Sequence, residues 1–251
     1  MAKQNGLVRL VGNVGDMTYY RSKDGYFARE KTSLTGDRIA TDPKFKRTRE
    51  NMTEFGSAGK AGKTLRDSIS LLLKNAKDGR LISRLCKTMM QVLKADTVNK
   101  RGQRKVSAGD INRLVGFEFN ANAVLNTTLF APYTTNMNRQ SGALNITIPA
   151  FKPSSSVIAP EGATHFKFVS AGAAINFDTQ VYTSGTSESA VLPWDENTTT
   201  DITLSNTVTA GSTLPLFLVL GIQFYQEVNG SQYALTNSSF NALSIVDLSK
   251  A

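Results

Sequence analysis

Residues 214–227 read Leu-Pro-Leu-Phe-Leu-Val-Leu-Gly-Ile-Gln-Phe-Tyr-Gln-Glu and contain the longest apolar run of the chain. Alternate positions along this run share one face of a β-strand, and that face carries Leu216, Leu218, Leu220, Ile222 and Phe224. Phe217 and Val219 make the opposite face apolar as well. A strand that is apolar on both faces has to be covered on both, so we expect it at the centre of a sheet.

Shorter strand-like runs lie on both sides of this central strand, and turn signals at 160–162, 183–185 and 229–230 separate several of them. The runs cover residues 144–148, 165–169, 174–177, 190–192, 201–207, 232–235 and 243–248. From about residue 120 onward Lys and Arg almost vanish, and Thr, Ser, Asn and Ala dominate. Many short strands with frequent turns predict an antiparallel β-sandwich or jelly-roll.

The first 31 residues also have the pattern of strands. Two runs, 17–21 and 26–30, flank Asp24-Gly25, and the glycine supplies the positive φ that a tight hairpin turn needs. A further short strand is expected over residues 7–11. Because an isolated hairpin is only marginally stable in water, we expect its aromatic side chains to form an assembly interface. These are Tyr19, Tyr20, Tyr26 and Phe27.

Between the two β-rich parts the apolar period becomes helical. One stripe runs through Leu65, Ile69, Leu72, Leu73 and Ala76, and a second runs through Leu81, Ile82, Leu85, Met89, Val92 and Leu93. Asp78-Gly79 separates them, so we predict two amphipathic helices joined as a helical hairpin. Residues 32–51 are polar and basic and are expected to form an exposed connection. Residues 107–110 are expected to cap a short helix that ends near Val115.

The length of 251 residues and the hydrophobic fraction of 40% are those of an ordinary globular protein. No apolar run reaches the ~18 residues that a transmembrane helix needs, and residues 1–6 lack the apolar core of a signal peptide. We therefore expect a cytoplasmic protein, or one within an assembled particle, that has no membrane span.

The net charge of +9 is unevenly distributed along the chain. Residues 1–115 carry 25 Lys and Arg against 11 Asp and Glu, whereas residues 116–251 carry 4 against 9. Such a division fits an anionic partner, DNA or RNA, and it equally fits contacts with the acidic half of other copies of the chain. A solvated basic face would have the same composition.

Residues 56–64, Gly-Ser-Ala-Gly-Lys-Ala-Gly-Lys-Thr, end like a phosphate-binding loop. That motif needs four residues between its first glycine and the Gly-Lys pair, and here five residues separate Gly56 from Gly62. The preceding residues are polar and do not form a buried strand. We therefore interpret the glycines as one face of a helix that lets another backbone approach closely.

The chain contains one histidine and one cysteine, which excludes an internal disulfide and the common multi-histidine metal sites. His165 is expected on the outer face of a strand beside Lys167, as a surface residue. Cys86 lies beside the apolar stripe of the second helix without a nearby histidine base, so we expect a buried, inert thiol. Trp194 suits either a loop anchor or an interface. We predict no catalytic residue, no metal site and no cofactor.

Two clusters of cations are the candidates for nucleic-acid binding. The first comprises Lys44, Lys46, Arg47 and Arg49, and the second comprises Lys100, Arg101, Arg104 and Lys105. Clustered cations are all that phosphate binding requires, so the signal is permissive and not specific. Phe45 lies within the first cluster, where it could stack on a base.

Several segments resemble an uncharacterised group of Bacteroidota proteins of similar length, roughly 250 residues. The segments are 12–20 (Gly-Asn-Val-Gly-Asp-Met-Thr-Tyr-Tyr), 24–26, 28–31, 47–51, 54–56, 59–63, 164–167 and 224–230. The resemblance extends over the whole chain. It implies no activity, partner or site residue.

Together these patterns predict an α+β protein. A basic N-terminal β-hairpin plus helical hairpin occupies residues 1–120, and an antiparallel β-sandwich or jelly-roll-like domain occupies residues 121–251. We expect a non-enzymatic, coat-like structural protein that self-assembles into a homopolymer such as a shell, sheath or filament. The main alternative is a nucleic-acid-binding protein that uses the basic N-terminal half. A carbohydrate-binding or adhesive β-module leaves the basic half unexplained, and an enzyme has the least support.

Overall fold

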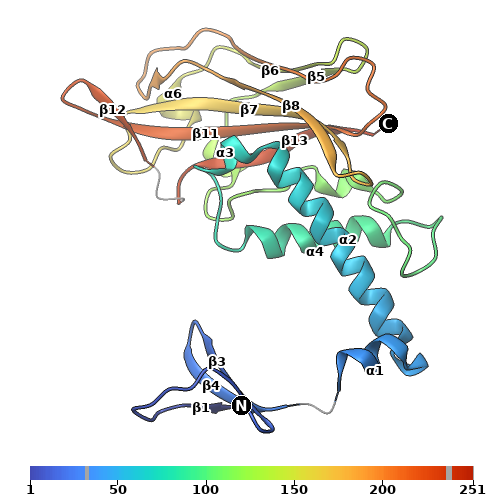
Figure 1. Cartoon of the computed structure of the whole chain (residues 1–251). Coiled ribbons are helices and arrows are strands. Elements are labelled where there is room, and N and C mark those ends of the chain that lie inside the picture. The colour runs from blue at the N-terminus through green and yellow to red at the C-terminus, as the bar shows by residue number, and fades with distance from the viewer. Residues whose placement is uncertain (32–33, 236–238, 251) are drawn as a thin grey trace. The chain divides into compact units, whose positions relative to one another are not determined.

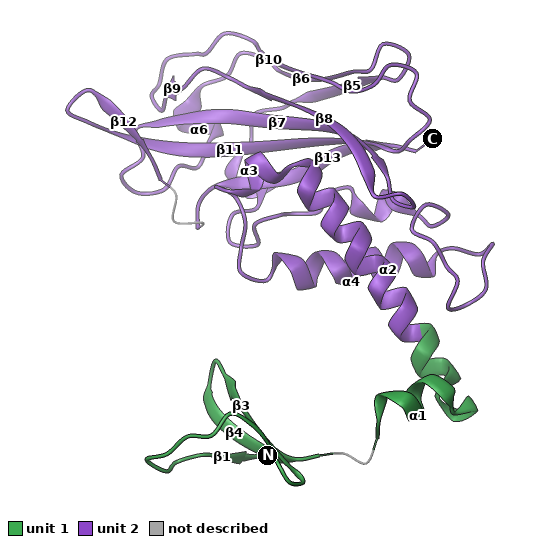
Figure 2. Cartoon of the chain, viewed as in Figure 1, with its two compact units in different colours: residues 1–50 green, residues 51–251 purple. Residues whose placement is uncertain are grey.

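The computed structural model describes residues 1–31, 34–235 and 239–250 (Figure 1). The chain divides into two compact units, Met1–Glu50 and Asn51–Ala251 (Figure 2). Both contain antiparallel β-sheet and the second also contains a helical hairpin, so the predicted α+β class is confirmed. The boundary expected at residue 120 lies inside the second unit. Among the described residues, no helix is long and apolar enough to cross a bilayer.

The first unit contains a small sheet of four antiparallel strands. Their order is β1 (Ala2–Lys3), β4 (Gly25–Glu30), β3 (Met17–Ser22) and β2 (Gly12–Val14). The predicted hairpin between β3 and β4 is confirmed, and Gly25 has a φ of 123°. The prediction of a strand over residues 7–11 is wrong. The Gln4 side chain accepts a hydrogen bond from the Leu10 amide at 2.9 Å and donates one to its carbonyl oxygen at 3.2 Å, which closes residues 5–9 into a loop.

The rest of the first unit is helical, although its polarity alone indicates an exposed connection. It contains α1 (Gly36–Thr41), the 3-10 turn η1 (Pro43–Phe45) and the start of α2 (Lys46–Ser68). Local caps explain these turns, because the Thr35 hydroxyl accepts from the Arg38 amide at 3.3 Å and the Asp42 carboxylate accepts from the Lys44 amide at 2.9 Å. The expected exposure of this segment is confirmed. Residues 32 and 33 lie outside the described residues.

The second unit contains the predicted helical hairpin, formed by α2 and α4 (Leu81–Lys94), with the short α3 (Ser70–Leu73) between them. Both apolar stripes are buried except at Ile82, which is 64% exposed. Three short helical turns follow, η2 (Ile111–Leu114), α5 (Leu125–Thr128) and α6 (Pro153–Ser156). The first of these is the short helix expected before Val115, but Asp110 is its N-cap residue, and the Ser107 hydroxyl instead donates to Asp178 at 3.0 Å.

Two antiparallel sheets complete the second unit. The smaller has the order β10 (Ile202–Thr207), β6 (Ala143–Ile148) and β5 (Thr134–Asn138). The larger is built on β11 (Leu216–Val228), which pairs on one side with β7 (His165–Asn176) and on the other with β12 (Ser231–Ala234) and β13 (Ala242–Ser249). β7 also pairs with β8 (Val181–Glu188) and β9 (Leu192–Pro193). The predicted central strand is therefore confirmed.

The two faces of β11 belong to two separate cores, which explains its continuous apolar sequence. The face that carries Leu220 packs in a core shared with the smaller sheet, and the face that carries Phe217 and Val219 packs in a core shared with α2 and α4. Figure 1 shows the three resulting layers of the second unit: smaller sheet, larger sheet and helices. The core between the larger sheet and the helices thus combines residues that precede and residues that follow position 120.

Small and polar residues account for the strands that sequence patterns miss. The sequence predicts two strands over residues 165–169 and 174–177, and apart from residue 177 both belong to the single strand β7. The residues in the middle of β7 have small side chains because the three-stranded sheet packs closely against them. A Cβ on Gly172 would lie only 2.7 Å from the Leu144 side chain. The turn expected at 183–185 is wrong, since these residues lie within β8 and Gly185 abuts the backbone of Thr207. β5 consists of Thr, Asn and Met and lacks the apolar alternation that predicts a strand.

Candidate assembly surface and basic clusters

The four aromatic side chains expected at an assembly interface lie on both faces of the N-terminal sheet. Tyr20 pairs with Phe27 across β3 and β4, and their rings stack at 6.0 Å. Tyr19 and Tyr26 occupy the opposite face, because successive residues of a strand point to opposite sides. All four side chains are only partly buried. The sheet therefore gathers these rings without covering them.

Arginine side chains lie over two of these rings. The guanidinium carbons of Arg9 and Arg21 are 5.1 and 5.7 Å from the centroid of the Tyr26 ring, and that of Arg29 is 5.7 Å from the Tyr20 ring. A cation above an aromatic face is attracted by the negative charge of that face. Each face of the sheet thus presents rings and cations together.

The first unit has almost no core of its own. Among the described residues of Met1–Glu50, Ala28 is the only buried one. Apolar side chains near the sheet are instead solvent-exposed, at 106% for Leu7, 78% for Val8, 69% for Val11 and 60% for Val14. Exposed apolar surface of this kind marks sites of contact with other molecules. The N-terminal sheet is therefore the candidate assembly surface.

The structure divides the first basic cluster into exposed and engaged cations. Arg49 is half-buried and donates from Nη1 to two main-chain carbonyl oxygens at 2.7 and 2.9 Å, so it stabilises the local fold. Arg47 pairs with Glu50 at 2.9 Å and remains exposed. Lys44 in η1 and Lys46 at the start of α2 are exposed as well. Three of the four predicted cations are thus accessible to an anionic partner.

Two buried carboxylates shape the loop that carries the second basic cluster. Glu54 in α2 is 2% exposed and accepts a hydrogen bond from the Gly102 amide at 2.8 Å. Asp96 is also 2% exposed and accepts from the amides of Val98, Asn99 and Lys105 at 2.9 to 3.0 Å. Burial alone raises the pKa of Asp96, but these hydrogen bonds outweigh burial and hold the pKa far below its usual value. The loop is therefore a fixed structure.

The arginines of the second cluster attach the loop to α2. Arg104 lies 3.9 Å from the Glu54 carboxylate, and Arg101 donates to the side-chain oxygen of Asn51 at 2.7 Å. Lys100 and Lys105 are exposed. A cleft of about 310 Å³ beside the loop has both cationic and anionic groups in its lining. This cluster therefore offers fewer available cations than its sequence indicates.

An apolar groove of about 390 Å³ lies between α2 and α4. It is lined in part by Phe55, Gly59 and Cys86. Cys86 is only partly buried, not fully buried as expected, and this burial raises the pKa of its thiol. Only one of the three α2 glycines has the close neighbour expected for this face, since a Cβ on Gly62 would lie 3.4 Å from Leu85 whereas Gly56 and Gly59 border open space. This stretch lies within α2 and does not form a phosphate-binding loop.

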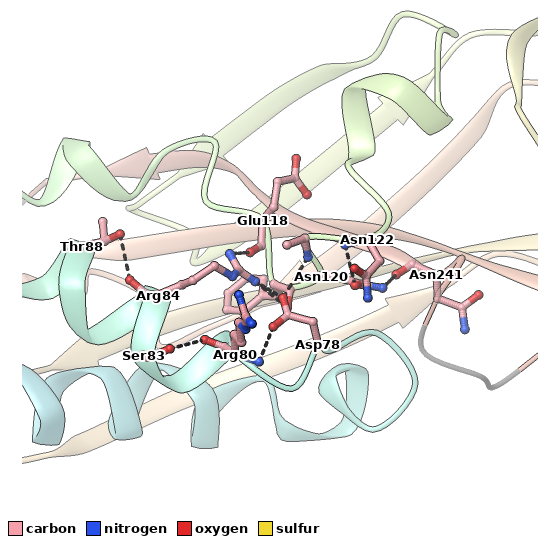
Figure 3. Close-up of polar contacts among 11 residues, drawn as sticks. Asp78, Arg80, Ser83, Arg84, Thr88, Glu118, Asn120, Asn122 and Asn241 are labelled. Atoms are coloured by element: carbon pink, nitrogen blue, oxygen red, sulfur yellow. Dashed lines mark hydrogen bonds and ion pairs between the residues drawn. The ribbon is translucent and has the colours of Figure 1, made fainter. Parts of the chain in front are cut away.

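A polar network joins the start of α4 to the larger sheet (Figure 3). The guanidinium of Arg84 forms an ion pair with Asp78 and donates to the carbonyl oxygens of Glu118 and Phe119 at 2.7 and 3.2 Å. The Asp78 carboxylate also accepts from the amides of Arg80 and Ala121 at 2.6 and 2.9 Å. Burial acts to raise the pKa of Asp78, but the hydrogen bonds and the guanidinium lower it below its usual value.

Glu118 has the opposite electrostatic environment. Burial raises its pKa to about 7, against the smaller effects of the Leu125 amide, the Ser244 hydroxyl and the Arg84 charge, each of which lowers it. Its Oε1 accepts from Leu125 at 3.2 Å, and its buried Oε2 has no hydrogen-bond partner among the described residues. Glu118 is not among the residues singled out from the sequence, although a glutamate between Phe117 and Phe119 is a signal of partial burial. The network ties elements together and presents no open site.

The remaining residues singled out from the sequence have structural contacts. The buried Phe166 and Phe168 confirm that His165 and Lys167 lie on the opposite face of β7. His165 is more covered than expected, because its side chain is 18% exposed and lies 3.5 Å from Glu227. Trp194 anchors a loop by donating from Nε1 to the Val157 carbonyl at 2.9 Å.

No group of three or more His, Cys, Asp or Glu side chains in the described part of the chain could hold a metal ion. Comparisons with known proteins give no match: no family model, no curated protein and no solved structure is significantly similar to this chain.

Proposed function

We propose that this chain is a non-enzymatic structural protein that self-assembles into a homopolymer, such as a shell, sheath or filament, through its N-terminal sheet. One observation carries the proposal: among the described residues of Met1–Glu50 only Ala28 is buried, although the sheet bears four aromatic rings. Covering apolar surface contributes roughly 25 cal/mol for each Å² removed from water. The aromatic sheet therefore gains stability when it meets a partner surface.

The second unit supports the same proposal. Its two cores, as far as the structure describes them, consist of residues from Ala58 onward, and none comes from the first unit. The basic and acidic halves of the sequence also make another copy of the chain a partner of complementary charge.

The test compares the full chain with a chain lacking residues 1–31, by light scattering and negative-stain microscopy. The full chain should form ordered particles, and the truncated chain should stay dispersed with an unchanged melting temperature and circular dichroism spectrum. Each sample is also treated with nuclease, because particles held together by nucleic acid dissolve and protein polymers do not. Particles of equal size from both chains would contradict the proposal, as would a full chain that stays monomeric at all concentrations.

Nucleic-acid binding is the second candidate, and the exposure of Lys44, Lys46 and Arg47 within four residues of η1 and α2 favours it. Replacing all three by Gln should weaken binding to DNA or RNA and lower the slope of log affinity against log salt by about 0.7 to 0.9 for each phosphate interaction removed. Arg49→Gln is the informative control, because this side chain bonds to the main chain and should affect stability more than the slope. An unchanged slope in the triple variant removes this cluster from any such interface.

A further inference from the structure

One end of the β-sheets in the second unit carries an exposed apolar patch. Phe130 is 59% exposed, Ile158 is 61% exposed and Trp194 is 37% exposed. Two contacts hold the segments of these residues together: Leu129 pairs with Val157 in an isolated β-bridge, and the Trp194 indole donates to the Val157 carbonyl. We call these three residues the end patch. Figure 2 shows β9, α6 and β12 at this end of the sheets.

The loops that carry the end patch contain several carboxylates and one exposed cation, Lys152 at the start of α6. Asp195 and Glu196 directly follow Trp194, and Glu161 lies in the turn that precedes β7. Glu227 reaches the same turn, since its amide donates to the Thr164 hydroxyl at 2.8 Å. Glu161, Glu196 and Glu227 are exposed. An apolar centre with an acidic rim is the complement of a surface that combines aromatic rings with cations.

The N-terminal sheet has that complementary composition. Residues 1–31 carry six Lys and Arg against three Asp and Glu. Two of these cations, Arg9 and Arg21, lie over the same ring, that of Tyr26, and both are exposed. Tyr19 shares this face of the sheet. Guanidinium groups bind carboxylates through paired hydrogen bonds while their flat faces remain on aromatic rings.

We propose that the sheet face bearing Tyr19, Tyr26, Arg9 and Arg21 of one copy docks on the end patch of the next copy, with its arginines against the carboxylate rim. This inference rests on the proposed self-assembly and specifies the two surfaces that meet. Because the two surfaces differ, each copy offers one of each kind. Such a heterologous contact closes into a ring or continues as a filament.

The test exchanges the charges of the two surfaces in the full chain. One variant carries Arg9→Glu and Arg21→Glu, and the other carries Glu161→Lys and Glu196→Lys. Like charges then face each other in each pure variant, which should raise the concentration required for assembly by about tenfold or more. A mixture of the two variants restores opposite charges at every contact, so it should assemble near the wild-type concentration as an alternating polymer.

Matched variants control for net charge and for the face of the sheet. The control for the arginine variant is Lys23→Glu with Arg29→Glu, which changes the charge of the sheet equally but away from the Tyr26 ring. The control for the glutamate variant is Asp67→Lys with Asp178→Lys, which changes the charge of the second unit equally on α2 and on the β7–β8 turn. Both should assemble much as the wild type does. Phe130→Ser tests the apolar centre and should impair assembly at any salt concentration, whereas charge effects weaken above ~0.5 M salt.

The outcomes that would overturn each proposal are distinguishable. Wild-type assembly together with unimpaired assembly of both charge variants would overturn this docking and leave self-assembly standing, with the groove between α2 and α4 as the next surface to test. Impaired variants whose mixture is not rescued would overturn it as well. A wild-type chain that never assembles would refute the proposed function itself. Circular dichroism of every variant verifies that it is folded.

Discussion

Arg84 in α4 donates from Nη1 to the main-chain carbonyl oxygen of Glu118 at 2.7 Å, across 34 positions of sequence. The same guanidinium pairs with Asp78, whose side chain is 7% exposed. One side chain therefore connects the turn between the helices, the helix α4 and the segment that leads into the sheets. These polar contacts add to the apolar core that the helices and the larger sheet share.

Arg84→Met should destabilise the second unit by about 3 kcal/mol. The substitution leaves the carboxylate of Asp78 buried without its cation and removes the donor of the Glu118 carbonyl, whereas the Phe119 carbonyl keeps the bond from the Asp78 amide at 3.4 Å. The measurement is the free energy of unfolding in urea. Arg80→Met is the matched control, because the Arg80 side chain is exposed and only its amide takes part in the network. Equal stabilities of the two variants would show that the network contributes little.

The buried carboxyl of Glu118 makes stability depend on pH. Its pKa is about 7 in the folded chain against an ordinary 4.5. Below pH 4.5 the group is protonated in both states, and between pH 4.5 and 7 it ionises only in the unfolded state, so its contribution lowers stability as the pH rises. Because the side chain is only partly buried, we expect the loss to be about 1–2 kcal/mol.

Comparison with Glu118→Gln isolates this contribution from other titrating groups. The amide keeps an acceptor for the Leu125 amide and carries no charge at any pH. Between pH 5 and pH 8 the unfolding free energy should therefore fall more for the wild type than for the variant. Parallel pH profiles for the two proteins would mean that Glu118 is better solvated than its environment in the structure implies.

The central strand and the helical hairpin could be predicted because periodicity reports directly on burial. β11 is apolar at every position from Leu216 to Ile222 apart from Gly221, and only a strand between two cores needs that composition. Strand pairing depends on long-range contacts that leave no local pattern. The small residues around Gly172 look like a break in the sequence, and only the approach of Leu144 from the other sheet explains them.

The sequence predicts the residue types of the candidate surfaces, but it does not predict which of their side chains are accessible to a partner. Aromatic and cationic residues gather visibly near the N-terminus, and the structure keeps the four rings on one sheet. The roles of Arg49, Arg101 and Arg104 were not visible, because each is engaged by a group that is distant in sequence or is a main-chain carbonyl. The end patch was also missed, since it combines loops that are far apart along the chain.

Leu220→Ala should cost about 2–5 kcal/mol, a large part of the ~5–15 kcal/mol that stabilises a domain. Leu220 is 0% exposed in the middle of β11, so the truncation leaves a cavity in the core between the two sheets. His165→Ala, at the start of β7, should cost about 1 kcal/mol or less, because it removes a contact with the half-exposed Glu227. Thermal melts of both variants test the assignment of the core. A Leu220→Ala protein that melts like the wild type would contradict it.

Gly59 and Gly109 each follow a Ser-Ala pair in the sequence, but replacement by alanine should have opposite effects on stability. A Cβ on Gly109 would overlap the main-chain carbonyl of Val92 at the end of α4, and neither backbone can move without disturbing the core, so Gly109→Ala should lower the melting temperature markedly. Gly59 lies inside α2 with open space around its Cα. Gly59→Ala should therefore stabilise the chain by about 0.5–1 kcal/mol, because alanine loses less backbone entropy in a helix. Differential scanning calorimetry of the two variants decides the matter, and a destabilised Gly59→Ala chain would mean that something occupies the groove beside α2.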